Sequence, residues 1–205
     1  MDSQATSHGS EQCRHHGHGA RVPRRRVLQG AAAASAAGLA GCLGGDGGGT
    51  APDPVTLDDR DTCDVCGMVI PKHPGPSAEI FYADHRPAGH DNPARFDSTW
   101  EAFKFDFDRG DWTRRAFYVT DYSSVDYEVR TDDGQRLIST HPQASAFADA
   151  HDVTFVVGSE VVGAMGRDLI GFGNRGDAES FRDEYGGDLA TFDEVTPSMI
   201  ASLGM

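Results

Sequence analysis

The residues best suited to chemistry lie in one stretch, residues 63–68, which read Cys-Asp-Val-Cys-Gly-Met and place two thiols and a thioether within six positions. Sulfur ligands are soft donors that favour Cu(I), whereas thiolates without a thioether also suit Zn²⁺ and iron–sulfur clusters. A methionine beside the cysteine pair shifts the preference towards copper, because zinc rarely takes thioether sulfur. Gly67 permits a turn that lets Cys66 and Met68 face one centre. The stretch therefore predicts a soft metal site.

Other interpretations of the cysteine pair remain open. A structural zinc site normally takes four nitrogen or sulfur ligands. No cysteine follows Cys66, however, and the later histidines show no paired spacing. A thioredoxin-like redox pair would sit at a strand-to-helix turn, whereas this pair precedes a segment, residues 69–71, that is predicted to be extended. A disulfide between Cys63 and Cys66 would be strained but possible outside the cell.

Met165 is a second candidate soft donor, in the run Gly-Ala-Met-Gly at residues 163–166. A methionine usually fills gaps in a hydrophobic core. The flanking glycines instead predict a tight, exposed backbone at this position. Met68 and Met165 each precede a strand–helix segment, so a two-fold repeat would bring both sulfurs to a shared site.

Hydrophobic periodicity and turn residues predict the elements that must position these donors. Residues 100–103 read Trp-Glu-Ala-Phe and residues 178–181 read Ala-Glu-Ser-Phe. Both have a glutamate in the second position and a phenylalanine in the fourth, which indicates a weak internal repeat. We predict an α+β fold of two pseudo-repeated strand-strand-helix-strand units, forming small mixed sheets with helices packed on them. The expected strands cover 78–83, 116–120, 125–130, 153–158, 169–172 and 189–192, and the expected helices cover 97–107, 144–150, 178–185 and the segment from 196 onward.

The N-terminal residues predict export. Arg24 and Arg25 lie in a run of three arginines and precede a short Ala/Gly-rich stretch, which is typical of a twin-arginine signal. This stretch is too short and too weakly apolar to span a bilayer. Residues 39–42 read Leu-Ala-Gly-Cys and resemble a lipobox, in which Cys42 becomes the lipidated first residue of the mature chain. We expect an exported lipoprotein on the extracytoplasmic face of the cell membrane.

This interpretation divides the chain into three parts. Residues 1–41 are predicted to be a twin-arginine lipoprotein signal peptide, and residues 42–60 a flexible Gly/Asp/Pro tether to the lipid anchor. Residues 61–203 are predicted to fold, in two halves at roughly 61–130 and 150–203.

The composition limits the possible functions. The formal net charge is −14, which excludes nucleic-acid binding through a basic face. The acids are scattered along the chain, which favours a salt-adapted surface and a halophilic source. Strand acids at Glu79, Asp84, Asp121 and Glu128 are interpreted as solvated faces. The chain has no Gly-x-Ser-x-Gly, phosphate-loop or His-Glu-x-x-His motif, so no enzymatic activity is predicted.

Several stretches together resemble the NosL family, the membrane-anchored copper lipoproteins that accompany nitrous oxide reductase, in a haloarchaeal form. The specific elements are Cys-Gly-Met at residues 66–68 and Ala-Met-Gly at residues 164–166. The acidic helix starts at 177–181 and 192–195 are less specific. The similarity runs from about residue 60 to 200.

The resemblance implies a Cu(I)-binding metallochaperone of two strand-rich halves. It implies delivery of copper for the assembly of the copper centres of nitrous oxide reductase, with the membrane-bound maturation machinery as further partners. Carried onto this sequence, it places the metal on Cys66 and Met68, with Met165 as third donor and Cys63 in reserve. Asp97 stands where some relatives carry a cysteine, so that accessory thiol is absent here.

Two other functions compete with copper delivery. The first is an extracytoplasmic thiol-disulfide oxidoreductase that uses Cys63 and Cys66. The second is a lipoprotein that binds a small molecule and has merely structural cysteines. Met68 favours copper, because neither alternative requires a thioether beside Cys66.

Overall fold

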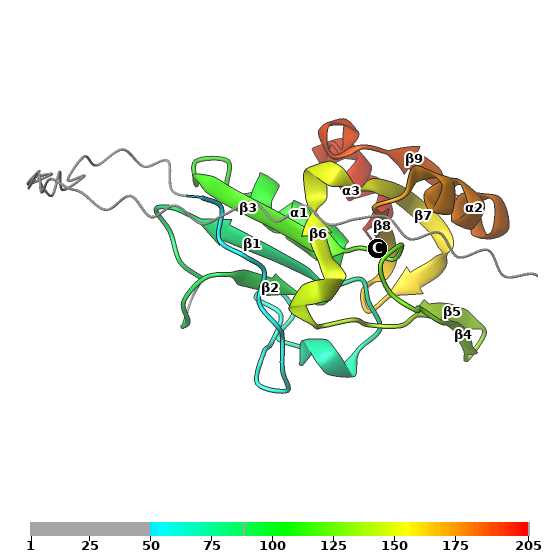
Figure 1. Ribbon diagram of the computed structural model, residues 1–205, viewed down its shortest axis with the longest axis horizontal. Helices are drawn as coiled ribbons and strands as arrows, with labels where there is room; N and C mark the ends of the chain where they lie inside the picture. The colour runs from blue at the N-terminus through cyan, green and yellow to red at the C-terminus, as the bar shows by residue number, and fades with distance from the viewer. Residues whose placement is uncertain (1–49, 88, 205) are drawn as a thin grey trace, which may run out of the picture. The chain divides into compact units, whose positions relative to one another are not determined.

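The structure, a computed structural model, describes residues 50–87 and 89–204 (Figure 1). The predicted export signal with Arg24 and Arg25, and the predicted lipid site Cys42, lie outside the described residues. Within the described part, no helix has the length and apolar character needed to cross a membrane. The elements in chain order are η1 (Ile70–Lys72), β1 (Ala78–Tyr82), β2 (Ala94–Phe96), α1 (Thr99–Phe107), β3 (Arg114–Thr120), β4 (Val129–Asp132), β5 (Gln135–Ile138), η2 (Ala144–Ala146), β6 (Phe147–Asp149), η3 (Ala150–Asp152), β7 (Thr154–Gly163), β8 (Gly166–Phe172), α2 (Arg175–Tyr185), β9 (Asp188–Ala190), η4 (Phe192–Glu194) and α3 (Pro197–Leu203).

The same chain order builds two similar units. The first runs β1, β2, α1, β3, and its central strand β1 pairs antiparallel with β2 and with β3. The second runs β7, β8, α2, β9, and its central strand β7 pairs antiparallel with β8 and with β9. The predicted α+β fold with a repeated strand-strand-helix-strand unit is confirmed.

Additional strands extend both sheets. Strand β6 pairs antiparallel with β3, and the β4–β5 hairpin joins the second sheet through a parallel pairing of β5 with β7. The hairpin turn falls at Asp133 and Gly134, whose positive φ angles of 45° and 81° are typical of a two-residue hairpin turn.

Two sequence-based expectations about these connecting segments are wrong. The strand expected at 125–130 begins at Val129. The helix expected at 144–150 is instead two short 3₁₀ turns on either side of β6. Because β6 hydrogen-bonds to the edge of β3, its backbone groups are satisfied by the sheet rather than by a helix.

The core lies on both sides of the second sheet. Phe155 and Val157 of β7 pack in a large cluster with α1 and the first sheet, while Val156 between them packs in a second cluster with Ala178 and Phe181 of α2. Alternate residues of a strand point to opposite faces. The continuous apolar run of β7 therefore reflects burial on both faces.

The second half of the predicted tether, 42–60, belongs to the folded part. The Val55 N–H donates to Glu79 Oε2 at 3.0 Å, and the Leu57 N–H donates to the Pro142 carbonyl at 2.8 Å. The Leu57 side chain is 2% exposed. The expectation of a flexible tether as far as residue 60 is therefore wrong, because Leu57 is buried and Val55 is half-buried against the fold.

Glu79 also differs from its expected role as part of a solvated strand face. Its side chain is fully buried, and its Oε1 atom has no hydrogen-bond partner. Burial raises the pKa of Glu79 to about 8, although the Val55 N–H and the charge of Arg95 oppose the shift.

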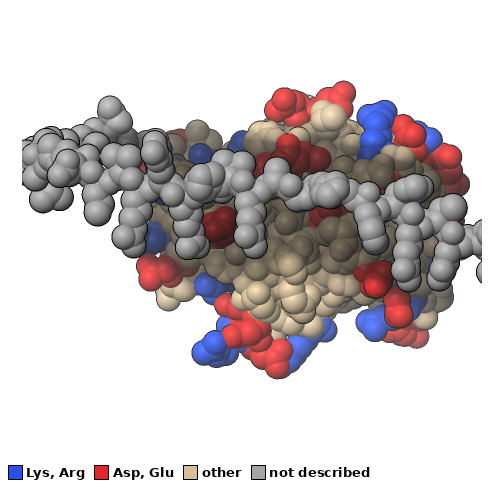
Figure 2. All heavy atoms as spheres, in the orientation of Figure 1, with Lys and Arg blue, Asp and Glu red and all other residues tan. Residues whose placement is uncertain are grey.

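The surface charge is spread rather than gathered. In Figure 2, acidic side chains occupy the top, right and bottom of the visible face, with basic side chains between them. This view fits the scattered acids of the sequence, since the basic side chains on its uncovered part are interspersed with acidic ones.

Candidate metal centre

The loop that carries the two cysteines is a tight turn closed by backbone hydrogen bonds. Thr62 pairs with Val69 in an isolated antiparallel bridge. The Cys63 N–H donates to the Met68 carbonyl, and the Gly67 N–H donates to the Cys63 carbonyl, both at 2.9 Å. Gly67 has a φ of 76°, in the left-handed region that favours glycine. The turn expected at Gly67 is present.

Asp64 ties this loop to β2. Its backbone N–H donates to the Arg95 carbonyl at 2.9 Å, and its carboxylate accepts from the Arg95 N–H at 2.8 Å. The carboxylate is also 2.9 Å from His90 Nε2. These contacts place the two thiols over the end of β2 and the start of α1.

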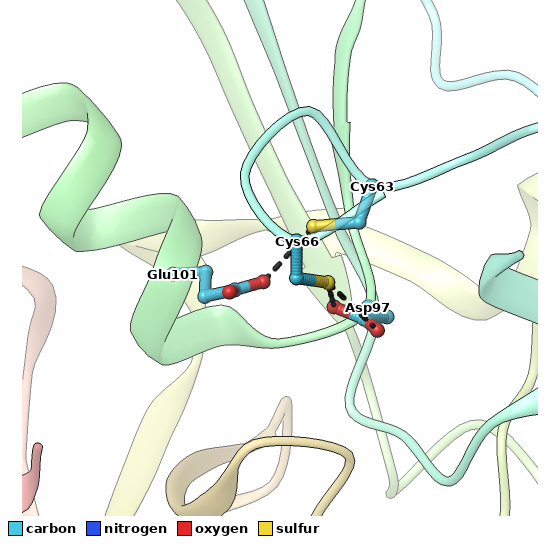
Figure 3. A group of neighbouring side chains, drawn as sticks. All are labelled: Cys63, Cys66, Asp97 and Glu101. Atoms are coloured by element: carbon cyan, nitrogen blue, oxygen red, sulfur yellow. Dashed lines mark hydrogen bonds between the residues drawn. The ribbon is translucent and has the colours of Figure 1, made fainter. Parts of the chain in front are cut away.

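Four ligand-bearing side chains converge there (Figure 3): Cys63, Cys66, Asp97 and Glu101. One ligand atom from each lies within 4.8 Å of all the others. The Cys63 thiol donates to Glu101 Oε2 at 2.9 Å, and the Cys66 thiol lies 3.4 and 3.5 Å from the two carboxylate oxygens of Asp97. Cys66 is half-buried, and the other three are buried.

The junction between β2 and α1 positions the two carboxylates of Asp97 and Glu101. Asp97 directly follows β2, and Glu101 lies in the first turn of α1. Between them, Ser98 caps the helix by accepting the Glu101 N–H at 3.2 Å. A serine cap with an acid three residues later is a strong helix-start pattern, so the sequence places this turn correctly.

Burial sets the protonation of the site. It raises the pKa of the Cys63 and Cys66 thiols, and the nearby charge of Asp97 raises both further. Burial also raises the pKa of Glu101 to about 7. Without metal, the thiols are therefore protonated at neutral pH, and a metal ion must displace their protons.

The predicted donors are brought together only in part. Cys63 and Cys66 lie side by side, and Met68 is half-buried at the end of the same turn. Met165 lies in the turn between β7 and β8, where it lines a hollow of about 300 Å³ with Pro74 and other residues that do not include the cysteines. The shared site for both methionine sulfurs stays a prediction.

Asp97 and Glu101 are the two site residues that sequence reasoning did not assign to the metal. Both were visible as parts of a helix start, at the N-terminal boundary and in the first turn. The sequence has no signal that this turn faces the cysteine loop, because that contact depends on the pairing of the loop with β2.

The geometry does not favour a redox enzyme. Low thiol pKa values in redox motifs arise at helix N-termini or beside cations. The segment 69–71, which was expected to be extended, instead leads into the short 3₁₀ turn η1, so that expectation is wrong. This turn is not a helix long enough to lower a thiol pKa, and both thiols have raised pKa values. Both cysteines are free thiols in the structure.

The cysteine loop carries an exposed apolar residue. Val65, between the two cysteines, is 48% exposed and is the one exposed large hydrophobic residue among those described. A hollow of about 200 Å³ adjoins it, lined by Asp64, Val65, Lys104, Phe105, Asp108 and Arg109.

Taken together, the two ββαβ units and the largely buried thiol–carboxylate cluster define a small α+β protein with a candidate metal-binding cluster built around two thiols. The sequence profile of the NosL family matches residues 54–200. The chain belongs to the NosL family.

Individual relatives agree with this assignment. The chain is 28% identical over 163 residues to the copper-binding lipoprotein NosL of Stutzerimonas stutzeri, covering 80% of this chain and 76% of that protein. It is also similar to the crystal structure of the copper chaperone NosL from Shewanella denitrificans, with 30% sequence identity and a TM-score of 0.54. That match covers 69% of this chain and 94% of the solved chain.

Proposed function

We propose that this protein is an extracytoplasmic Cu(I)-binding metallochaperone that delivers copper for the assembly of the copper centres of nitrous oxide reductase. The observation that carries the proposal is the pair of free thiols at Cys63 and Cys66, which lie side by side in a NosL-family fold, with Cys63 buried and Cys66 half-buried. One relative is named a copper-binding lipoprotein and the other a copper chaperone, which supports copper as the ion that this protein carries.

The oxidation state follows from the donors. Cys63, Cys66 and Met68 offer soft sulfur within one turn, and such ligands select Cu(I). We expect Cys66 and Met68 to be the principal donors, with Cys63 in reserve and Met165 as third donor. A small number of sulfur donors lets a partner's ligand enter and exchange the ion, which a chaperone requires.

The access to the site supports transfer. Cys66 is only half-buried, and Val65 beside it is exposed. Among the four clustered ligand residues, Cys66 alone is partly exposed, so an acceptor must approach the ion from the side of Cys66 and its loop neighbour Val65. We propose that the copper acceptor docks at Val65 and takes the ion through Cys66.

Export and membrane attachment complete the proposal. The Stutzerimonas stutzeri relative is named a lipoprotein, and in this chain Arg24, Arg25 and Cys42 form the corresponding sequence pattern. We propose that the protein is exported and held by a lipid on Cys42 at the extracytoplasmic face of the membrane. Mass spectrometry of the membrane-extracted protein tests this, because an unmodified Cys42 in the mature chain would contradict it.

The central experiment is a Cu(I) titration of the reduced full chain against a chromophoric chelator. We expect about one Cu(I) per chain, with copper-edge X-ray absorption showing sulfur neighbours. Cys66→Ser is expected to weaken binding strongly, while Ser124→Ala, at an exposed serine, serves as the control. A copper shell of nitrogen and oxygen alone would overturn the proposal.

A further inference from the structure

The described chain begins at Thr50, beside one end of the first sheet (Figure 1). The Arg115 guanidinium of β3 donates to the Thr50 carbonyl at 2.8 Å. The Tyr118 hydroxyl of the same strand donates to the Pro52 carbonyl, also at 2.8 Å. Residues 50–57, which we call the strap, are therefore tied to the first sheet, and they fix the point at which the chain enters the fold.

The strap leaves only a short connection to the proposed lipid site. Residues 43–49 separate Cys42 from Thr50. Because a chain spans at most about 3.3–3.6 Å per residue, Cys42 lies within about 30 Å of Thr50. A folded domain of about 150 residues is about 40 Å across. A lipid on Cys42 therefore brings the part of the fold near Thr50, rather than the part farthest from it, to the bilayer.

Two loops form the end of the fold beside the first residue of the strap (Figure 1). One joins β1 to β2, and the other joins α1 to β3. Since β1 and β3 are antiparallel, β1 ends where β3 begins, and the two loops meet there. The Ala83 N–H donates to the Thr113 carbonyl at 2.9 Å, and the Asp84 carboxylate accepts the Thr113 N–H at 3.0 Å. We call residues 83–87, 89–93 and 108–113 the loop end.

The loop end presents a tryptophan and two arginines. Trp112 is half-buried, and the His85 ring stacks on its indole with the ring centroids 4.4 Å apart. Arg109 Cζ lies 5.2 Å from the centroid of the same indole ring. The Arg86 side chain is 64% exposed and lies 3.5 Å from Asp91. Tryptophan and arginine are typical of the membrane–water interface, where the indole sits among the headgroups and the cation attracts anionic lipid.

Most acids of the loop end have internal partners. Asp84 lies 3.0 Å from His85 Nδ1. Asp108 pairs with Lys104 at 2.6 Å. Asp111 is exposed and has no ion-pair partner among the described residues. The loop end therefore repels an anionic surface less than the formal net charge of −14 suggests.

The loop end also adjoins the candidate metal centre. His90 Nε2, in the first of the two loops, lies 2.9 Å from the Asp64 carboxylate of the cysteine loop. Arg109, in the second, lines the same hollow as Val65. A bilayer at the loop end therefore holds the cysteine loop close to the membrane surface, within reach of a membrane-bound acceptor.

We propose that the loop end, with Trp112 and Arg86 foremost, is the surface of this protein that contacts the headgroup layer of the lipid bilayer. The docked strap holds it there by shortening the connection to the lipid. The proposal rests on the lipid attachment at Cys42 in the proposed function. It adds the face that the anchored protein turns towards the membrane, which the attachment alone leaves open.

The chain has two tryptophans, Trp100 and Trp112, and their positions provide the test. Trp100 lies in the first turn of α1, whereas Trp112 follows the other end of this helix. The variants Trp100→Phe and Trp112→Phe each leave one tryptophan in the lipidated full chain. They are reconstituted in vesicles of phosphatidylcholine and phosphatidylglycerol, with and without lipid brominated near the headgroup.

We expect brominated lipid to quench the fluorescence of Trp112 about twofold or more, and that of Trp100 by less than about a tenth. Circular dichroism checks that both variants are folded. Equal quenching of the two tryptophans, quenching of Trp100 alone, or quenching of neither would overturn the proposal.

A charge reversal tests the same surface with both tryptophans in place. Arg86→Glu should lower the quenching by brominated lipid about twofold, because an acid replaces a cation at the headgroups. Arg130→Glu, exposed on β4 of the second sheet, is the matched control and should leave the quenching unchanged. Equal effects of the two variants count against the loop end as the contact surface.

Mass spectrometry of Cys42 separates this proposal from the proposed function. A lipidated chain in which Trp112 is not quenched overturns the orientation alone and leaves the membrane attachment intact. An unmodified Cys42 in the mature chain overturns both.

Discussion

Asp168 on β8 caps the helix of the other unit through Ser98. Its carboxylate accepts the Ser98 hydroxyl and the Trp100 N–H, each at 2.8 Å, and it is 1% exposed. Asp168 therefore links the second ββαβ unit to the start of α1. Because Ser98 also accepts the Glu101 N–H, this link helps to fix the helix turn that carries Glu101.

Removal of Asp168 should destabilise the whole fold. Asp168→Ala leaves the buried Ser98 hydroxyl and the partly buried Trp100 N–H without their partner, which costs about 2–4 kcal/mol in the free energy of unfolding. Urea denaturation measures this loss. Asp188→Ala, at an exposed position on β9, is the matched control and should change stability by less than about 0.5 kcal/mol. Equal effects of the two variants would contradict a capping role for Asp168.

Glu79 should make stability fall as the pH rises. Its pKa is 4.5 when unperturbed and about 8 in the folded protein, owing to burial. Below pH 4.5 both states are protonated at this site, so its contribution is fully present. Between pH 4.5 and 8 the unfolded chain gains charge at this site while the folded chain does not, so stability is lost until the folded pKa is passed.

The variant Glu79→Gln removes this titration and keeps an oxygen acceptor for the Val55 N–H. We expect wild type to lose on the order of 1–3 kcal/mol relative to the variant between pH 5 and 8, and nothing more above that range. Chemical denaturation at a series of pH values measures the difference. The exposed Glu128→Gln variant should run parallel to wild type. A parallel curve for Glu79→Gln as well would show that Glu79 ionises normally in the folded state.

Val65 should matter for copper transfer rather than copper binding. Val65→Glu places a charge at the exposed mouth of the site, so docking of an acceptor protein should weaken while the sulfur ligands stay unchanged. We expect transfer to apo-nitrous oxide reductase to slow about tenfold or more, with transfer to a small chelator unaffected. Thr131→Glu, exposed on β4, should leave both rates unchanged. If Val65→Glu slows the chelator reaction equally, the residue acts on the site and not on docking.

Met165 tests the predicted convergence of sulfur donors. If Met165 is the third donor, Met165→Leu should lower Cu(I) affinity by about tenfold, as measured in competition with a chelator. The substitution retains volume and apolar character, so the fold should be preserved. Met199→Leu on α3 is the matched control. An affinity equal to wild type would confine the copper ligands to the cysteine loop.

Features determined over short sequence distances were predictable. The Cys-x-x-Cys-Gly-Met turn, the Ser98 helix cap and the Thr196 cap before α3 each depend on residues within a few positions. The ββαβ repeat was also predictable, because alternating apolar strands and capped helices recur in the same order. The segment at 144–150 was misassigned because pairing with β3 outweighed its local helical preference.

The sequence by itself determined which soft donors are available, because Cys63, Cys66 and Met68 lie within six residues of one another. Only the tertiary structure decided what surrounds that centre. Asp97 and Glu101 lie more than thirty residues from Cys63, and they reach it because Asp64 binds the cysteine loop to β2. The burial of Glu79 was likewise decided by the segment around Val55. Such contacts depend on long-range packing, which leaves no periodic signal in the chain.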